Sequence, residues 1–195
     1  KVFIDTLMGQ KSVLSEKMKY EIGSLGIVFN GIAYSSDLGL FCAVGTGGVI
    51  LTSSDGATWT SQTSGVSTTL YGITYSSDLG LFVAVGLSGT ILTSADGTTW
   101  TSQISGVSTA LDGIAYSSDL GLFVAIVGSK FLTSSDGITW TSQTSGVSVS
   151  LEGIAYSSDL GLFCAVGYNG VILTSPDGVT WTSQTSGVST ALDGI

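Results

Sequence analysis

A nearly identical repeat runs through most of this sequence and restricts its fold more than any other feature. Four stretches can be aligned residue by residue, and each contains one tryptophan. These tryptophans are Trp59, Trp100, Trp140 and Trp181. They follow one another after 41, 40 and 41 residues, because the third copy lacks one residue in the loop around Gly128 and Ser129. Self-similarity at such a fixed period predicts a repeat architecture.

The repeat also predicts the domain organisation. Residues 1–30 are a separate N-terminal segment: a linker, a short helix or a closing strand. Leu14, Met18 and Ile22 recur every four residues and favour a short amphipathic helix, while 24–30 is a candidate for the strand that closes against the first copy. The copies are 31–71, 72–112, 113–152 and 153–193. The start of a further copy at residue 194 predicts that more repeats follow.

Each copy contains four short segments with strand character. In the first copy they are 31–35, 40–44, 49–52 and 58–62. The second is continuously apolar, as expected of a strand buried on both faces. An Asp-Gly pair before the fourth segment favours a tight hairpin, since glycine adopts positive φ without strain. Four antiparallel strands in this period predict an all-β fold, a β-propeller or partial propeller of four-stranded blades of about 41 residues.

The Asp-Gly turns carry a family resemblance. Residues 53–59, Ser-Ser-Asp-Gly-Ala-Thr-Trp, and their counterparts resemble the Asp-box, or bacterial neuraminidase repeat, Ser-x-Asp-x-Gly-x-Thr-Trp. The residue between Asp and Gly is missing here, so a tighter turn is expected. The resemblance implies a structural box between the third and fourth strands, away from any active site, with the tryptophan packed against the turn of its own blade. The implied structural residues are Asp55, Gly56, Trp59, Asp96, Gly97, Trp100, Asp136, Gly137, Trp140, Asp177, Gly178 and Trp181.

The missing residue types argue against catalysis. The sequence contains no histidine and no arginine, so the commonest general base and the bidentate anion clamp are absent. Sialidases of the resembling family use three arginines and a tyrosine–glutamate pair, which this chain cannot supply. We therefore predict a protein that is not an enzyme and needs no cofactor. The tyrosines at one repeat position are expected to pack between blades: Tyr34, Tyr75, Tyr116 and Tyr156.

Charge restricts the class of partner. Residues 31–195 carry eleven acidic residues against the single Lys130, whereas residues 1–30 carry four lysines and three acids. An acidic body repels phosphate backbones, which argues against nucleic acid. Apolar runs stay far below the roughly 18 residues that span a membrane, which argues against membrane insertion. A glycan or a protein remains the expected partner, and an oligomer or additional blades could close the ring.

The cysteines and aspartates, which could in principle bind metals, are expected to have structural roles. Cys42 and Cys164 occupy a repeat position that is valine in the other copies, so we predict buried packing without a disulfide between them. The aspartates lie in glycine-containing turns, where carboxylates usually accept backbone N–H bonds. They include Asp37, Asp78, Asp119 and Asp159. No run groups enough acids for calcium, so no metal site is predicted.

Two variable positions point to the ligand site. The loop after the second strand differs between copies, and only the fourth copy combines an aromatic with an amide there, Tyr168 and Asn169. The residue before each Gly-Ile also varies, as Tyr71, Asp112, Glu152 and Asp193. Recognition and neutral drift both explain such variation. We predict a non-enzymatic module that binds a glycan or protein, extracellular, on a cell surface or in a virus particle. The alternative is an architectural element of a larger assembly, such as a phage tail or appendage.

Overall fold

The computed structural model describes residues 26–194, and these form sixteen strands in four sheets. The helix predicted within 12–22 lies outside the described residues. Blade 1 is β1 (Phe29–Ser35), β2 (Leu40–Gly45), β3 (Ile50–Ser53) and β4 (Thr60–Gln62). Blade 2 is β5 (Leu70–Ser76), β6 (Leu81–Gly86), β7 (Thr90–Ser94) and β8 (Thr101–Ile104). Blade 3 is β9 (Gly113–Ser117), β10 (Leu122–Val127), β11 (Lys130–Ser134) and β12 (Thr141–Thr144). Blade 4 is β13 (Leu151–Ser157), β14 (Leu162–Gly167), β15 (Ile172–Ser175) and β16 (Thr182–Gln184).

Within every blade the strands pair antiparallel in chain order, so each sheet is a simple meander. Three blades have one turn of 3-10 helix after their second strand: η2 (Thr46–Gly48), η3 (Leu87–Gly89) and η4 (Tyr168–Gly170). The expected strand bounds are close to those observed, with two differences in blade 1. Its first strand starts earlier, at Phe29, and its last starts later, at Thr60, because 54–59 belongs to the Asp-Gly turn.

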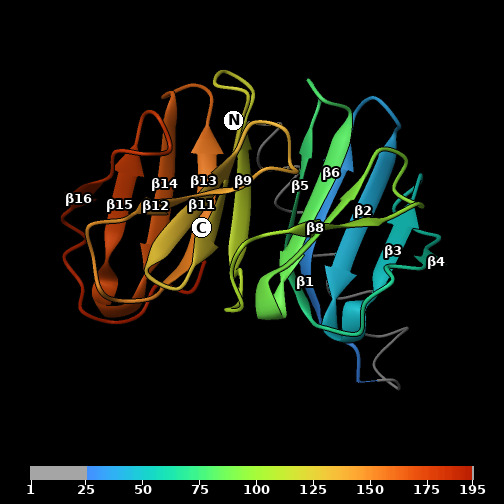
Figure 1. Cartoon of the computed structure of the whole chain (residues 1–195), viewed down its shortest axis with the longest axis horizontal. Helices are drawn as coiled ribbons and strands as arrows, with labels where there is room; N and C mark the ends of the chain where they lie inside the picture. The colour runs from blue at the N-terminus through green and yellow to red at the C-terminus, as the bar shows by residue number, and fades with distance from the viewer. Residues whose placement is uncertain (1–25, 195) are drawn as a thin grey trace.

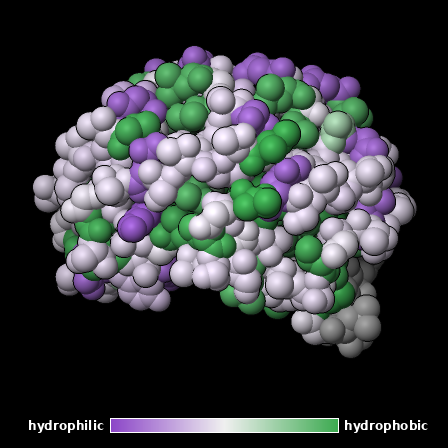
Figure 2. All heavy atoms as spheres, viewed as in Figure 1, coloured by the Kyte–Doolittle hydropathy of each residue, from purple (hydrophilic) through white to green (hydrophobic). Residues whose placement is uncertain are grey.

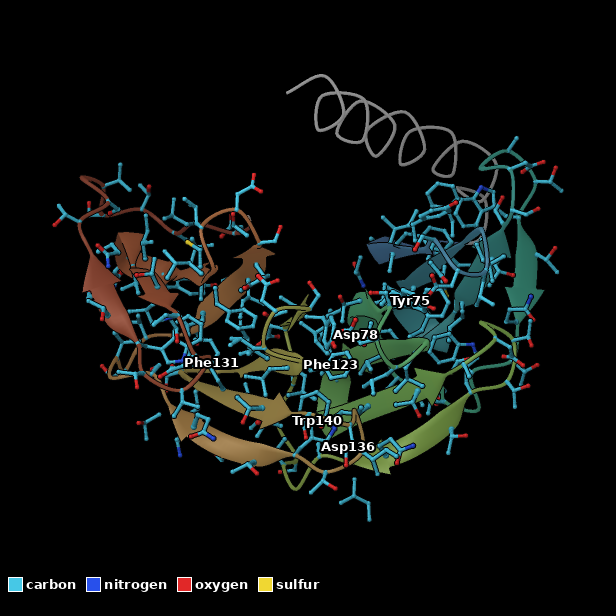
Figure 3. The ribbon with its side chains drawn as sticks, turned by 90° about the horizontal axis from the view of Figure 1, so that it is seen from above. Tyr75, Asp78, Phe123, Phe131, Asp136 and Trp140 are labelled. Atoms are coloured by element: carbon cyan, nitrogen blue, oxygen red, sulfur yellow. The ribbon has the colours of Figure 1, made fainter. Side chains whose placement is uncertain are left out.

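The four sheets lie side by side in chain order (Figure 1). Seen from above they form an open arc, with the first strand of each blade on the inner side and the last on the outer side (Figure 3). The first strands of consecutive blades contact one another, β1 with β5, β5 with β9 and β9 with β13. This radial arrangement of four-stranded blades is that of a β-propeller. It confirms the predicted fold class.

The hydrophobic core consists of the layers between neighbouring blades. One layer joins Cys42 and Val44 of blade 1 to Phe82 and Ala84 of blade 2, and the next two layers repeat it. Strand 40–44 is less buried than predicted. Residues 42–44 are buried, and Leu40 is partly exposed like its counterparts in the other blades. Phe41 is partly exposed because no described blade packs against its face of blade 1, whereas the matching phenylalanines of the other blades are fully buried.

On the outer, convex side of the arc, hydrophobic and hydrophilic residues alternate over the surface (Figure 2). The outermost strands supply much of this side, and their threonine, serine and glutamine side chains are mostly exposed. Gln103 nevertheless donates from Nε2 to Thr93 Oγ1 across 2.8 Å, and Gln62, Gln143 and Gln184 make the same bond in their blades. Each polar outer strand is thereby held to the apolar strand beside it.

Candidate functional site

The meander gives the arc two different ends. Turns between the first and second strands and between the third and fourth strands lie at one end, here called the turn side. Loops between the second and third strands, and the connections from one blade to the next, lie at the other end, the loop side. The residues of the predicted Asp-box belong to the turn side, and the two variable positions noted in the sequence belong to the loop side. The two ends can therefore be compared directly.

On the turn side, one carboxylate oxygen of each Asp-Gly turn, Oδ1, accepts three local hydrogen bonds. Asp96 Oδ1 accepts from the backbone N–H of Thr98 at 2.8 Å and of Thr99 at 2.7 Å, and Ser94 Oγ donates to it at 3.0 Å. These bonds, led by the backbone N–H of Thr99, hold the pKa of Asp96 well below its usual range. The same contacts lower the pKa of Asp55, Asp136 and Asp177 to about 2. These carboxylates are occupied structurally.

The glycine of this turn is required by its geometry. Gly97 has φ +73°, and a Cβ there would lie 2.7 Å from Leu40 Cδ2 of the preceding blade. Trp100 donates from Nε1 to the Gly97 carbonyl at 3.1 Å, and Trp140 makes the same bond to Gly137 at 3.2 Å. Both rings therefore close their own turns. Figure 3 shows Trp140 and Asp136 on the outer side of the arc, and Tyr75 and Asp78 nearer its inner side.

The fourth tryptophan departs from the expected packing. Trp181 stacks on Phe131 of the preceding blade, with ring centroids 3.9 Å apart and planes 12° apart. Its buried Nε1 has no hydrogen-bond partner among the described residues. The cause is a substitution in blade 3, where Phe131 occupies the position that is isoleucine in the other blades, as at Ile50 and Ile91. The larger ring reaches across the junction and becomes the main partner of the indole.

The tyrosines connect neighbouring blades through the other set of turns. Tyr75 donates its hydroxyl to Asp37 of blade 1 at 2.8 Å. Tyr116 and Tyr156 make the same bond to Asp78 and Asp119 of their preceding blades, at 2.7 Å each. The expectation that these aspartates accept local backbone bonds is wrong, because a serine takes that role. In blade 1 it is Ser35, whose Oγ accepts from the N–H of Leu38 at 3.1 Å.

On the loop side, one residue at the start of each inner strand forms a series that we call the inner rim. Its members are Asn30, Tyr71, Asp112, Glu152 and Asp193. The strand register shifts at Asn30, Tyr71 and Glu152, so each of these residues sits in a β-bulge. A bulge leaves its extra residue outside the ladder and re-aims the side chain. The rim is neutral in the first two blades and acidic beyond them.

The acidic rim residues interact with one another. Burial raises the pKa of Asp112. Burial also raises the pKa of Glu152, and the charges of Asp112 and Asp193 raise it further. The charges of Asp112 and Asp193, one from the repeat on each side, therefore repel that of Glu152 at the inner end of the arc. Sequence reasoning noted this position only as variable, because the repeat separates its members by about 40 residues and only the arc brings them together.

The predicted ligand residues lie beside this rim. Tyr168 is 51% exposed and Asn169 is exposed, and both belong to η4. The N–H of Tyr168 donates to the carbonyl of Ser150 at 3.0 Å, two residues before Glu152. Asn169 has φ 58°, a left-handed conformation that asparagine tolerates, and Ser88 has φ 59° at the same place in η3. Because Ser88 adopts the same backbone conformation, the turn does not require the amide of Asn169. The side chains of Tyr168 and Asn169 are therefore free for other contacts.

The two cysteines and one surface depression are the remaining candidate features. Cys42 is fully buried between blades, and burial raises its pKa to about 12, as expected of a packing residue. Cys164 occupies the same slot in the last blade and is partly exposed. A shallow depression of about 490 Å³ lies on the loop side of blade 1, lined by Gly48, Gln62 and Val66 among others, with no ionisable side chain. Within residues 26–194, no three ligand-type side chains group to hold a metal.

Within residues 26–194, no helix has the length and apolar character needed to cross a bilayer.

No protein-family model matches the sequence, and neither does any curated protein. Solved structures resemble the fold. YCF48 bound to a D1 peptide superposes with a TM-score of 0.59 at 19% identity, over 82% of this chain and 53% of that chain. A GH74 enzyme of Niastella koreensis gives 0.59 at 24% identity, over 79% and 24%. A chain of a mitotic checkpoint complex gives 0.66 at 11% identity, over 84% and 51%.

This chain thus spans about half the length of two of these structures and about a quarter of the third. Identities this low show the fold alone, a β-propeller assembled from repeated blades. One neighbour is described as an enzyme and another as bound to a peptide, so the fold accommodates different activities.

Proposed function

We propose that this chain is a non-enzymatic propeller module that binds a positively charged segment of a partner protein on its loop side. The observation that carries the proposal is the acidic half of the inner rim. Asp112, Glu152 and Asp193 come from successive repeats, and the charges of Asp112 and Asp193 add to burial in raising the pKa of Glu152. Tyr168 is exposed next to this group.

Charge selects the class of ligand. Carboxylates that repel one another gain most from a lysine or arginine placed among them, since the cation removes the repulsion as well as adding an attraction. The only cation in residues 31–195 is Lys130, so this part of the chain offers little compensation. Tyr168 adds a flat apolar face with a polar tip, which suits the stem of a basic side chain. A partner is expected to supply the missing positive charge.

Two further assignments belong to this proposal. The Asp-Gly turns are a shortened form of the Asp-box, and their saturated carboxylates support a structural role like that implied by the resemblance. The absence of histidine and arginine from the sequence supports a binding role over catalysis. The setting we propose is extracellular, on a cell surface or in a virus particle. The glycan ligand predicted from Tyr168 and Asn169 stays a prediction.

A peptide-array experiment tests the function. The whole chain is presented with short synthetic peptides that are rich in lysine and arginine, or acidic with the same apolar residues, and in parallel with a glycan array. We expect binding to basic peptides that weakens with added salt. An Asp112→Asn, Glu152→Gln double variant should weaken it about tenfold or more, and Tyr168→Ala, Asn169→Ala should also weaken it.

A matched control removes the same charge from the other end of the arc. The Asp37→Asn, Asp78→Asn double variant lies on the turn side, so peptide binding should be retained. Equal loss in both double variants would contradict a defined site and indicate a general charge effect. Binding to glycans but not to peptides would favour the predicted glycan ligand over a basic peptide. If the chain binds neither class, the architectural alternative becomes the better description.

A further inference from the structure

The loop side of blade 3 differs from that of the other three blades. Blades 1, 2 and 4 carry a turn of 3-10 helix after their second strand, whereas blade 3 joins β10 to β11 through Gly128 and Ser129 alone. Gly128 has φ +58°, and no atom of the described residues lies within 4 Å of the place that a Cβ would take. The space beside this shortened loop is therefore open.

The shortened loop is bonded to the acidic half of the inner rim. The backbone N–H of Gly128 donates to the carboxylate of Asp112 in blade 3. The carbonyl of Gly128 accepts from the N–H of Leu151 at 3.0 Å, and Leu151 directly precedes Glu152 of blade 4. One glycine thus joins the rim of two neighbouring blades.

A cation follows this loop directly. Lys130 is the first residue of β11 and its side chain is exposed. The other blades have uncharged residues at this position, Val49, Thr90 and Val171. The next residue, Phe131, faces blade 4, where it stacks on Trp181. Because side chains alternate between the two faces of a strand, Lys130 points to the side of blade 2.

The repeat shows what Lys130 faces there. In blade 2 the hydroxyl of Thr90 lies 3.0 Å from that of Thr68, in the connection that enters from blade 1. Lys130 by analogy faces the connection 105–112, which ends at Asp112. The lysine and the inner rim therefore border the same end of one blade.

The spacing of the two charges follows from the strand pairing. The N–H of Asp112 donates to the carbonyl of Ile126 in β10 at 3.2 Å, and Val127 of β10 pairs with Lys130. The backbones of Asp112 and Lys130 are thus two strand spacings apart, about 10 Å. No cation among the described residues contributes to the pKa of Asp112 or Glu152. Opposite charges therefore occupy separate places beside an open loop.

Building on the proposed function, on which this inference rests, we propose that the partner segment carries an acidic residue about three positions from its basic residue. The basic side chain lies at Asp112 and Glu152, and the acidic side chain pairs with Lys130. An extended segment advances about 3.3 Å per residue, so three residues cover the distance between the two charges. A segment with basic residues alone would place a cation against Lys130. Charges of both signs thus fix the register of the bound segment.

A peptide series tests this pattern. Each peptide has one lysine and one glutamate placed one to six positions away, and a matched peptide has glutamine in place of the glutamate. By fluorescence anisotropy, the whole chain should bind the peptide with a spacing of about three about two- to fivefold more tightly than its glutamine match. Lys130→Gln should abolish this difference, Lys130→Arg should keep it, and Lys130→Glu should reverse it.

A control variant separates a local contact from net charge. Ala57 is exposed on the turn side, at a position that differs in every copy. The double variant Lys130→Gln, Ala57→Lys has the net charge of the original chain, and it should not regain the preference for glutamate. Melting temperatures verify that all variants fold.

The possible results are distinct. If the chain binds basic peptides with equal affinity whatever the place of the glutamate, this inference is wrong and the proposed function stands. Recovery of the preference through Ala57→Lys would show a general charge effect and also overturn the inference. If no basic peptide binds, the proposed function fails and this inference fails with it.

Discussion

The turn side and the loop side are built on the same sixteen strands but differ in how their polar groups are used. On the turn side, the carboxylate of Asp96 is saturated by local N–H and hydroxyl donors, and its pKa is lowered. On the loop side, Asp112 and Glu152 are partly buried, and burial raises the pKa of both, even though the backbone N–H of Gly128 bonds to Asp112. Carboxylates therefore stabilise the fold on the turn side and destabilise it on the loop side.

This difference separates structure from recognition within a repeat protein. Identical groups in every blade can hold identical turns, but a binding site needs groups that differ and converge. The turn side repeats its Ser-Asp-Gly contacts in every copy, while the inner rim changes from Asn30 to Glu152 along the arc. Groups that cost stability and still converge are typical of functional sites. The comparison therefore supports the proposal that ligand contacts lie on the loop side, while the turn side stabilises the fold.

The largest expected effect concerns one aromatic residue at each end. Trp100→Ala removes a partly buried indole and its bond to Gly97, and should lower the free energy of unfolding on the order of 2–3 kcal/mol. Tyr168→Ala removes an exposed ring on the loop side and should change it by less than about 0.5 kcal/mol. Chemical denaturation of both variants measures the difference. Equal losses would show that the two ends do not differ in this way.

A second prediction concerns acid. The folded pKa of Asp55, Asp136 and Asp177 is about 2, below the ordinary value near 3.8, so the folded state binds fewer protons in this range. Their contribution is complete above pH 4 and is lost as the pH falls through about 2. Melting temperature should therefore fall steeply between these limits. Asp136→Asn should reduce the slope and destabilise the chain at neutral pH, and an unchanged slope would contradict the assignment.

Breaking one bond between blades should have a smaller effect. Tyr116→Phe removes the hydroxyl that donates to Asp78 and keeps the ring packed on Phe123, whose centroid is 4.6 Å away. We expect a loss of about 0.5–1 kcal/mol in the free energy of unfolding, because the bond is exposed. Tyr34→Phe is the matched control, since its hydroxyl has no such partner among the described residues.

The smallest effect has the opposite sign. The folded pKa of Asp112 is raised by burial, so the ionised carboxylate destabilises the fold. The protonated Asp112 side chain carries no such penalty, so the fold is most stable below the unfolded pKa of this carboxyl group. That stability is lost as the pH rises through the folded pKa. Asp112→Asn should therefore raise the free energy of unfolding at neutral pH by a few tenths of a kcal/mol, since partial exposure to water screens the charge. A destabilised variant would show that this carboxylate is structural after all.

Some parts of the candidate site could be predicted and others could not. Tyr168 and Asn169 differ from the other copies at one repeat position, and that difference is visible in the sequence. The bulges that hold Tyr71 and Glu152 have no such signal, because they depend on how an inner strand pairs with its neighbour. The bond from Tyr75 to Asp37 was equally hidden, since it joins residues 38 positions apart across a junction.

The sequence by itself determined the number of strands per copy, the chemistry of the Asp-Gly turn and the apolar residues between blades, because each depends on contacts within about one repeat or its neighbour. Only the tertiary structure decided which carboxylates act on one another and which side chains bond across a junction. Both properties depend on the rotation between neighbouring blades, which accumulates along the arc. A repeated sequence specifies that rotation only through the packing of whole blades, so Asp112, Glu152 and Asp193 become neighbours only when the arc has formed.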